Sequence, residues 1–421
     1  MPMTLAEKIL ARASGRESVR PGEIVTCQVD LAMCHDSSGP RRYGPRLAEI
    51  GAKVWDPSKV VVVSDHFVPA VDPESAQILK LTRDWVKDNG IEHFYDMQGI
   101  CHIKLAEGGH LKPGMFVCGG DSHSTNGGAF GCYMAGYGAT EMTGVMATGE
   151  IWVKVPETIR VEISGEFGPA IAAKDIMLHL CGTLGMDNHF RVVQYAGPTV
   201  AAMGMPERMV LTNMAAELGA ETGIIEGDAT TLDWLRAAGA DIPADALRWQ
   251  GDADASYLAR HDLDIGVLAP QVAAPHSPAN AGDVGRHAGQ AVDQCYIGAC
   301  TGAKISDLHM VAKVLKGRKV SKQTRLLVAP STVETTRLAA ADGTLETITE
   351  AGAIMLPSGC GACAGLGAGI LAAGETCISS TNRNFRGRMG SADSDVFLAS
   401  PYTVAASAIA GAITDPREFV R

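Results

Sequence analysis

Short, almost continuous apolar runs, each followed by a polar or glycine-rich loop, recur along this chain of 421 residues. Strands that are buried on both faces carry such runs, whereas half-exposed strands alternate apolar and polar residues. The pattern therefore predicts an α/β protein in which helices cover both faces of parallel sheets. The predicted buried strands are residues 60–63, 115–118, 292–297, 353–356 and 376–380.

The length of the chain predicts two or three domains, because a single hydrophobic core rarely extends over so many residues. Residues 159–163 alternate strictly, as a half-exposed strand does, and residues 228–285 are rich in Ala, Asp, Gly and Pro. This change of pattern indicates a separate middle domain. The predicted domains are residues 1–155, 156–286 and 287–421.

Helix start and stop signals predict one amphipathic helix over residues 72–89 and another over residues 306–317. Cys300 lies between the predicted strand at 292–297 and the second of these helices. We therefore expect Cys300 in a loop at the carboxyl end of a strand. Open α/β sheets bind their ligands at such ends.

Charge and composition exclude several function classes. The net charge of −11 argues against nucleic acid or an anionic membrane surface as the main partner. Eleven cysteines are too few for a disulfide scaffold and the first residues lack a signal-peptide pattern, so a cytoplasmic protein is expected. The uncharged run 351–374 is long enough for a membrane span, but Pro357 and many glycines favour a buried strand, loop and helix.

Three cysteines form the most informative candidate site. Cys360 and Cys363 are a C-x-x-C pair, and Cys300 lies upstream of them. Three thiolates can bind a cubane iron–sulfur cluster and leave its fourth iron open, and an open iron is a Lewis acid. A zinc site, a redox dithiol and simple packing thiols are alternatives. Zinc would need a fourth ligand, and the nearest histidine, His309, falls on a predicted helix.

Two Asp-His segments are candidates for proton transfer. In Asp65-His66 and in Asp121-Ser122-His123, a carboxylate beside an imidazole can fix its tautomer and raise its basicity. Neighbouring residues often fail to hydrogen-bond well, so a capping aspartate beside a surface histidine is the alternative for each segment.

Arginines in the segment 382–388 follow a predicted strand. Arg383, Arg386 and Arg388 could bind a di- or tricarboxylate through bidentate pairs, and solvated surface arginines are the alternative. His102 follows a turn-like glycine and is a weaker candidate, because a histidine in such a position is more commonly a hydrogen-bonded core residue.

Together these segments resemble the aconitase superfamily in their order and spacing. The resemblance covers nearly the whole chain and is strongest to the large subunits of 3-isopropylmalate dehydratases (isopropylmalate isomerases) and homoaconitases. It implies three α/β/α domains around a central cleft, without the fourth, swivelling domain of single-chain aconitases. The segments that carry it are Asp65-His66, Gly120-Asp-Ser-His123, Gly298-Ala-Cys300-Thr, Gly359-Cys-Gly-Ala-Cys363 and Asn382-Arg-Asn-Phe-Arg-Gly-Arg388.

The resemblance also implies a cofactor and a reaction. A [4Fe-4S] cluster would be bound by Cys300, Cys360 and Cys363, and the enzyme would be a hydro-lyase that reversibly dehydrates a small hydroxy di- or tricarboxylic acid. His66, oriented by Asp65, resembles the group that gives a proton to the departing hydroxyl. The other implied site residues are His102, Asp121 and His123 for proton relay and orientation, Arg383 and Arg388 for substrate carboxylates, and Ser122 and His35 for weaker substrate contacts.

A protein partner follows from the same resemblance. Single-chain aconitases carry their catalytic serine on the swivelling domain, and the isopropylmalate and homoaconitate enzymes carry that domain on a separate small subunit. We therefore expect an obligate small subunit that closes the active site.

The chain departs from the family pattern at several positions. Gln194 stands where family members usually carry Glu and cannot be a carboxylate partner for His123, which predicts an impaired relay. Homoaconitate, 2,3-dimethylmalate, methylmalate, citraconate or maleate are therefore alternative substrates. A non-catalytic iron–sulfur or iron-sensing protein and a structural zinc protein are alternatives of another class. The remaining departures are Gly120, Ser124, Ala362 and the segment 301–304.

Overall fold

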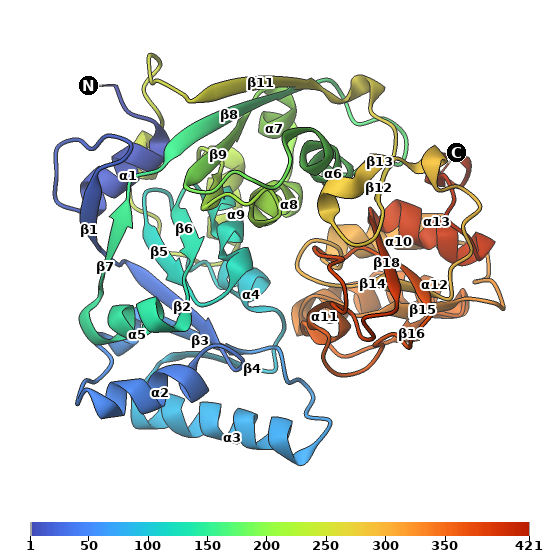
Figure 1. Cartoon of the computed structure of the whole chain (residues 1–421), viewed down its shortest axis with the longest axis horizontal. Helices are drawn as coiled ribbons and strands as arrows, with labels where there is room; N and C mark the ends of the chain where they lie inside the picture. The colour runs from blue at the N-terminus through green and yellow to red at the C-terminus, as the bar shows by residue number, and fades with distance from the viewer. Residues whose placement is uncertain (1, 421) are drawn as a thin grey trace.

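The computed structural model describes residues 2–420 and confirms an α/β fold built on parallel sheets (Figure 1). The first sheet is parallel throughout, and β2, β3 and β5 within it are buried at every position. Burial on both faces explains why these strands are continuous apolar runs in the sequence. In spatial order the strands are β4 (His93–Asp96), β3 (Val60–Ser64), β2 (Leu31–His35), β5 (Phe116–Gly119) and β6 (Tyr133–Gly136).

The middle sheet is also parallel throughout. Strand β8 contains the alternating residues 159–163, and its inward side chains are buried while those on the other face are more exposed, as predicted. Strands β8 and β11 run side by side along the top of the molecule in Figure 1. The spatial order is β10 (Thr222–Ile224), β9 (Arg191–Ala196), β8 (Glu157–Ser164) and β11 (Ala259–Asp264).

Within residues 2–420 the C-terminal sheet contains seven strands, and β12 runs in the opposite direction to the other six. Strands β12 and β13 pair here, although the sequence analysis assigned their residues to the middle domain; the domain boundaries stay predictions. In spatial order the strands are β13 (Ala281–Asp283), β12 (Gln271–Ala273), β18 (Asp395–Ala399), β17 (Thr376–Ser379), β14 (Gln294–Ile297), β15 (Arg325–Val328) and β16 (Ile354–Met355). A separate antiparallel ribbon joins β1 (Ile24–Gln28) to β7 (Glu150–Lys154).

Helices cover the sheets and confirm both helix predictions. Helix α3 begins after Asp72, whose side chain accepts a hydrogen bond from the backbone N–H of Ser75, and α10 begins at Ile305, one residue earlier than predicted. The helices are α1 (Leu5–Ala13), α2 (Pro40–Glu49), α3 (Pro73–Asp88), α4 (Cys101–Glu107), α5 (Ala139–Thr148), α6 (Ala173–Leu184), α7 (Pro198–Ala202), α8 (Met205–Asn213), α9 (Ala229–Ala237), α10 (Ile305–Leu315), α11 (Val333–Ala341), α12 (Thr344–Glu350) and α13 (Pro401–Ala410). The 3-10 segments near the site are η2 (Ser122–Phe130), η3 (Met214–Ala216) and η8 (Gly361–Ala364).

The uncharged run 351–374 forms the short strand β16, loops and η8. The helix that the sequence analysis predicted at the end of this run is wrong, since only the 3-10 segment forms. Gly365, Gly367 and Gly369 all have positive φ, and this backbone conformation ends a helix. Within residues 2–420, no helix has both the length and the apolar character needed to cross a bilayer.

A shared hydrophobic core joins the middle sheet to the C-terminal sheet. It contains Val161 and Tyr195 from the middle sheet, Ile176 from α6, and Tyr296 and Leu398 from the C-terminal sheet, all nearly inaccessible to solvent. Because apolar burial is the main favourable term in folding, this core holds the two sheets in a defined relative position. The loops at their edges are therefore positioned against each other as well.

Substitution of Gly128 tests the close packing of η2 on β10. A Cβ on Gly128 would lie 1.7 Å from the carbonyl oxygen of Gly223, so Gly128→Ala requires the two segments to separate. We expect this variant to lower the thermal unfolding midpoint by several degrees, measured at a fixed scan rate. Gly144→Ala in α5 is the matched control: its new Cβ meets no atom within 4 Å, so a gain of up to about 1 kcal/mol is expected. Equal midpoints for the two variants would contradict the packing.

Candidate active site

Four of the predicted site residues lie at the carboxyl ends of adjacent strands in the first sheet. His35 is the last residue of β2, Asp65 and His66 follow β3, and Asp121 follows β5. Parallel strands end at the same edge of a sheet, so these side chains converge there. Helix α4 adds His102 to the group.

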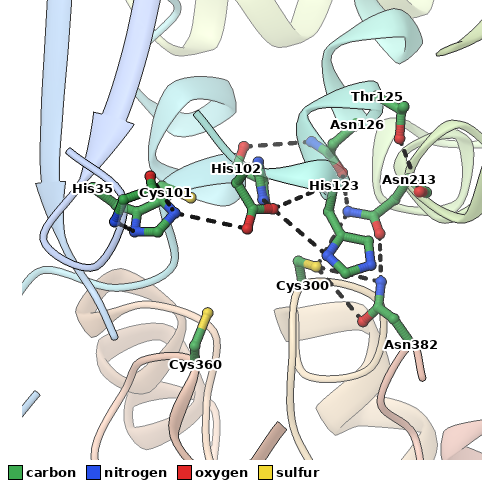
Figure 2. A network of polar contacts seen from close by, with 12 residues as sticks. His35, Cys101, His102, His123, Thr125, Asn126, Asn213, Cys300, Cys360 and Asn382 are labelled. Atoms are coloured by element: carbon green, nitrogen blue, oxygen red, sulfur yellow. Dashed lines mark hydrogen bonds and ion pairs between the residues drawn. The ribbon is translucent and has the colours of Figure 1, made fainter. Parts of the chain in front are cut away.

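Asp121 lies at the centre of three histidines. Its Oδ1 is 2.8 Å from His102 Nε2 and accepts a hydrogen bond from the backbone N–H of His123 at 2.8 Å. Its Oδ2 is 3.7 Å from His35 Nε2, and Figure 2 shows the three histidine rings gathered together. Burial by itself would raise the pKa of Asp121, but the hydrogen bonds from His102, His123 and His35 hold that pKa well below its ordinary value. Asp121 is therefore a carboxylate that can orient the three histidine side chains around it.

Asp65 and His66 form a direct hydrogen-bonded pair. His66 Nδ1 lies 2.7 Å from Asp65 Oδ1, and Asp65 is fully buried. Burial favours neutral imidazole, but the Asp65 carboxylate outweighs it and raises the pKa of His66 to about 9. Burial likewise opposes ionisation of Asp65, yet His66 lowers its pKa to about 2. A capping aspartate beside a surface histidine does not describe this pair.

Asp36, which the sequence analysis did not select, holds the backbone of the same loop. Its carboxylate accepts hydrogen bonds from the backbone N–H groups of His66 at 3.0 Å and Phe67 at 2.8 Å. The ring of His35 stacks on that of His66 with a centroid separation of 3.9 Å. The position of His66 is thus set from three sides, by Asp36, Asp65 and His35.

The carboxylate partner of His123 is Glu217, and this corrects the inference drawn from Gln194. His123 Nε2 lies 2.9 Å from Glu217 Oε1, whereas the Gln194 amide donates to Glu226 at 3.2 Å. Glu217 is buried, but its pKa is still lowered because His123 and other cations outweigh the effect of burial. The substitution at Gln194 therefore leaves the His123 relay with a carboxylate, supplied by another element.

Of the predicted arginines, Arg383 joins this network. Its Nε donates to Glu217 Oε1 at 2.8 Å. Arg388 contributes a buried Nε that has no hydrogen-bond partner among the described residues, which is the kind of donor that a bound carboxylate would satisfy. Ser122 is exposed, and its side chain forms no hydrogen bond within residues 2–420. The structure therefore does not bring Ser122 into the network.

The cysteines approach the histidines from the C-terminal sheet. Cys300 lies in the loop between β14 and α10, as predicted, and Cys360 and Cys363 lie at η8. The backbone N–H of Cys360 donates to the Asp65 carbonyl at 2.8 Å, and a Cβ on Gly359 would meet that same oxygen at 2.8 Å. Figure 2 shows the sulfurs of Cys300 and Cys360 directed toward the histidine group.

The surroundings of the cysteines fit an iron–sulfur cluster better than one zinc ion. Within residues 2–420, the groups of three or more His, Cys, Asp or Glu donor atoms that lie within 4.8 Å of one another contain no cysteine. A single tetrahedral zinc ion would hold its sulfur ligands about 3.8 Å apart. Burial raises the pKa of Cys300 to about 12, so its thiolate needs a nearby cation.

Two amide side chains complete the environment of Cys300. Asn213 Nδ2 donates to Cys300 Sγ at 3.2 Å and Asn382 Nδ2 at 3.6 Å, and the two asparagines also hydrogen-bond each other. Such donors stabilise negative charge on sulfur. Asn213 and Glu217 come from α8 and the residues after η3, where the sequence carries no motif that would have identified them.

Comparison with known proteins places these observations in a family context. Residues 7–290 and 282–411 match the model of the aconitase family (aconitate hydratase). The chain is 46% identical over 425 residues to 3-isopropylmalate dehydratase large subunit 1 of Methanopyrus kandleri, covering 100% of both sequences. It is 42% identical over 423 residues to the probable methanogen homoaconitase large subunit of Methanothermobacter thermautotrophicus, covering 99% of this chain and 98% of that one. Among solved structures, Thermococcus kodakaraensis aconitase X matches in fold over 88% of each chain, with a TM-score of 0.51 and 14% identity.

Asp65→Asn is expected to lower the pKa of His66 from about 9 toward or below its ordinary value. Burial lowers this pKa, and the variant lacks the Asp65 carboxylate whose negative charge outweighs burial. With Asp65 intact, the protonated ring stabilises the fold fully below a pH of about 6.5, and this stabilisation is lost as the pH rises through about 9. Histidine NMR titration of the cluster-free chain measures both values. Asp342→Asn, beside the exposed His309, is the control and should leave His66 unchanged. A His66 pKa that stayed near 9 in Asp65→Asn would assign the shift to other groups.

Proposed function

The chain belongs to the aconitase family, and on that premise we propose that it is the cluster-bearing large subunit of a hydro-lyase acting on 3-isopropylmalate. The reaction is the reversible dehydration of a small hydroxy acid, with rehydration at the neighbouring carbon. The observation that carries this proposal is the contact between the Cys360 loop and the Asp65-His66 pair. This contact supports a single site for the proposed metal-binding and proton-donating groups.

An iron–sulfur cluster follows from membership of the family, and we propose the [4Fe-4S] form held by Cys300, Cys360 and Cys363. Bound through these three cysteines, such a cluster would offer one iron without a protein ligand, which would act as a Lewis acid toward the substrate. Asn213 and Asn382 donate to Cys300 Sγ and thereby support negative charge on this ligand.

His66 is the proposed general acid. Loss of hydroxide from the substrate requires a proton, and the raised pKa of His66 keeps the ring protonated at neutral pH. Asp65 holds Nδ1, so Nε2 is the atom left to donate the proton. Stacking against His35 and burial of Asp65 restrict the ring to this orientation.

The second network supports substrate binding and charge balance. Asp121 orients His102 and His123, and Glu217 connects His123 to Arg383. We assign Arg383 and Arg388 to the substrate carboxylates, which guanidinium groups bind through paired hydrogen bonds. The Nε of Arg388, a buried donor without a partner in residues 2–420, supports this assignment, because buried polar groups without partners are costly.

A separate small subunit is the proposed partner. The names of the similar chains call them large subunits, which implies a small one. We assign to that subunit the swivelling domain and the serine that removes the carbon-bound proton. Eleven free cysteines fit a reducing compartment, so we propose a cytoplasmic location.

Homoaconitate is the second candidate substrate, because the homoaconitase large subunit is nearly as similar to this chain as the isopropylmalate dehydratase subunit. A decayed, iron-sensing protein is less well supported. The observation in its favour is Gln194, which cannot be a carboxylate partner for His123, and Glu217 provides that carboxylate instead.

Anaerobic purification and assay test the proposal. The chain should be brown and lose its visible absorbance in air, and together with its small subunit it should convert 3-isopropylmalate faster than homoaconitate. A colourless protein would overturn the cluster. A brown complex that turned over neither acid would overturn the activity while leaving the cluster in place.

Cys363→Ser is expected to abolish stable cluster binding, reducing iron from about four per chain to well below one, because two cysteines cannot hold the cubane. Iron and sulfide analysis of the anaerobically reconstituted chain measures the change. Cys377→Ser, a buried cysteine on β17 of the same sheet, is the control and should keep its iron. Equal iron in both variants would remove Cys363 from the ligand set.

His66→Gln should keep the cluster and reduce kcat by about a hundredfold or more, as expected when a general acid is removed. The assay uses the complex with its small subunit, and the visible spectrum confirms that the cluster is present. His309→Gln, which changes an exposed histidine on α10, should have no effect on kcat. Full activity in His66→Gln would transfer the role of the acid to another residue.

A further inference from the structure

Lys174 is a fully buried lysine that the reaction described above does not use. It is 1% exposed, and within residues 2–420 no acidic side chain forms an ion pair with it. Burying an ammonium group without a carboxylate is costly, so such a residue requires a reason. Burial lowers the pKa of Lys174 to about 8, and the group therefore remains mainly protonated at neutral pH.

The position of Lys174 does not stabilise the helix that carries it. It lies in the first turn of α6, where the positive end of the helix dipole disfavours a cation. Its neighbour Asp175 accepts hydrogen bonds from the backbone N–H groups of Ala172 and Gln271 and so attaches the start of α6 to β12. The Asp175 contacts hold the helix in place, whereas Lys174 points toward the loops of the candidate site.

Lys174 Nζ connects two of those loops. It donates to the carbonyl of Thr381 at 2.6 Å, to the carbonyl of Ser380 at 3.3 Å and to Thr301 Oγ1 at 3.3 Å. Thr301 follows Cys300 directly, and Thr381 precedes the Asn382–Arg388 segment. One ammonium group thus fastens the loop of a proposed cluster ligand to the loop of the proposed substrate-binding arginines.

Most of the groups whose negative charge favours the protonated form of Lys174 belong to the same site, and Cys181 on α6 is a further one. Glu217, Cys300 and Cys363 are the groups whose negative charge most favours its protonated form. Three thiolates and sulfide leave an iron–sulfur cluster with net negative charge in a buried place. Reduction potential depends on the net charge and hydrogen bonding around such a cluster.

We propose that Lys174 is a positioning residue of the cluster site, which fastens the Cys300 loop to the Asn382–Arg388 loop and places a fixed positive charge behind the cysteine sulfurs. The inference rests on the proposed function, because it requires a cluster at Cys300, Cys360 and Cys363. It assigns to α6, an element without a cluster ligand, control over the potential at which the cluster accepts or loses an electron.

The test measures the reduction potential and the EPR spectrum of the full-length chain after anaerobic reconstitution with iron and sulfide. Lys174→Met removes the charge and the hydrogen bonds, and Lys174→Gln removes the charge but keeps a donor. Both should bind iron and show a more negative potential than wild type, because a lost positive charge disfavours reduction. Lys174→Arg keeps the charge and should stay close to wild type. Lys313→Met, the same change at an exposed position on α10, is the matched control and should cause no shift.

Two outcomes would overturn the role of Lys174. One is a potential in Lys174→Met and Lys174→Gln that equals wild type, and the other is an equal shift in Lys174→Arg, which would assign the effect to packing. If Lys174→Met fails to fold, the reduction potential of Lys174→Gln is compared with that of Lys313→Met. A more negative potential in Lys174→Gln then supports the role of Lys174, and equal potentials overturn it. A wild-type chain that binds no cluster would overturn the proposed function itself, so the two failures are distinguishable.

Discussion

Asp65 is the residue on which the arrangement of the site depends. Its Oδ1 pairs with the His66 ring, its Oδ2 accepts a hydrogen bond at 2.7 Å from the backbone N–H of Cys101, and its carbonyl accepts one from Cys360. The first of these contacts charges His66, the second positions the start of α4, and the third holds the Cys360 loop. A single buried residue therefore joins the proposed acid, a histidine-bearing helix and a cysteine loop from the C-terminal sheet.

The charges in this site result from two opposing effects: burial disfavours charged side chains, and hydrogen-bonded partners of opposite charge favour them. Burial alone would neutralise Asp65, Asp121 and Glu217, yet each pKa is lowered because histidines or an arginine lie within hydrogen-bonding distance. Desolvated pairs of this kind are strong where both partners are present, and removal of one partner is costly. The site therefore behaves as connected networks, in which protonated His66 supplies a positive charge beside Asp65 and Lys174 is proposed to supply another from α6.

Much of the fold could be predicted from the sequence because its signals are local. A strand buried on both faces needs a continuous apolar run, so β3 and β14 were found within a few residues of their ends. Helix α3 was found because Asp72 caps it and a proline starts it. The helix expected late in residues 351–374 was wrong, because glycines with positive φ allow only the turn η8 there.

By itself the sequence determined the cysteines, the Asp-His segments and the arginine loop, since each is a motif of adjacent residues whose chemistry is visible from residue type and spacing. Only the tertiary structure decided their partners. Glu217, Asn213, Asp36 and Lys174 act across distances that no local pattern encodes, because hydrogen bonds and ion pairs depend on which elements pack together. For the same reason Gln194 misled the sequence analysis: the charge that His123 needs comes from whichever carboxylate the fold brings within reach.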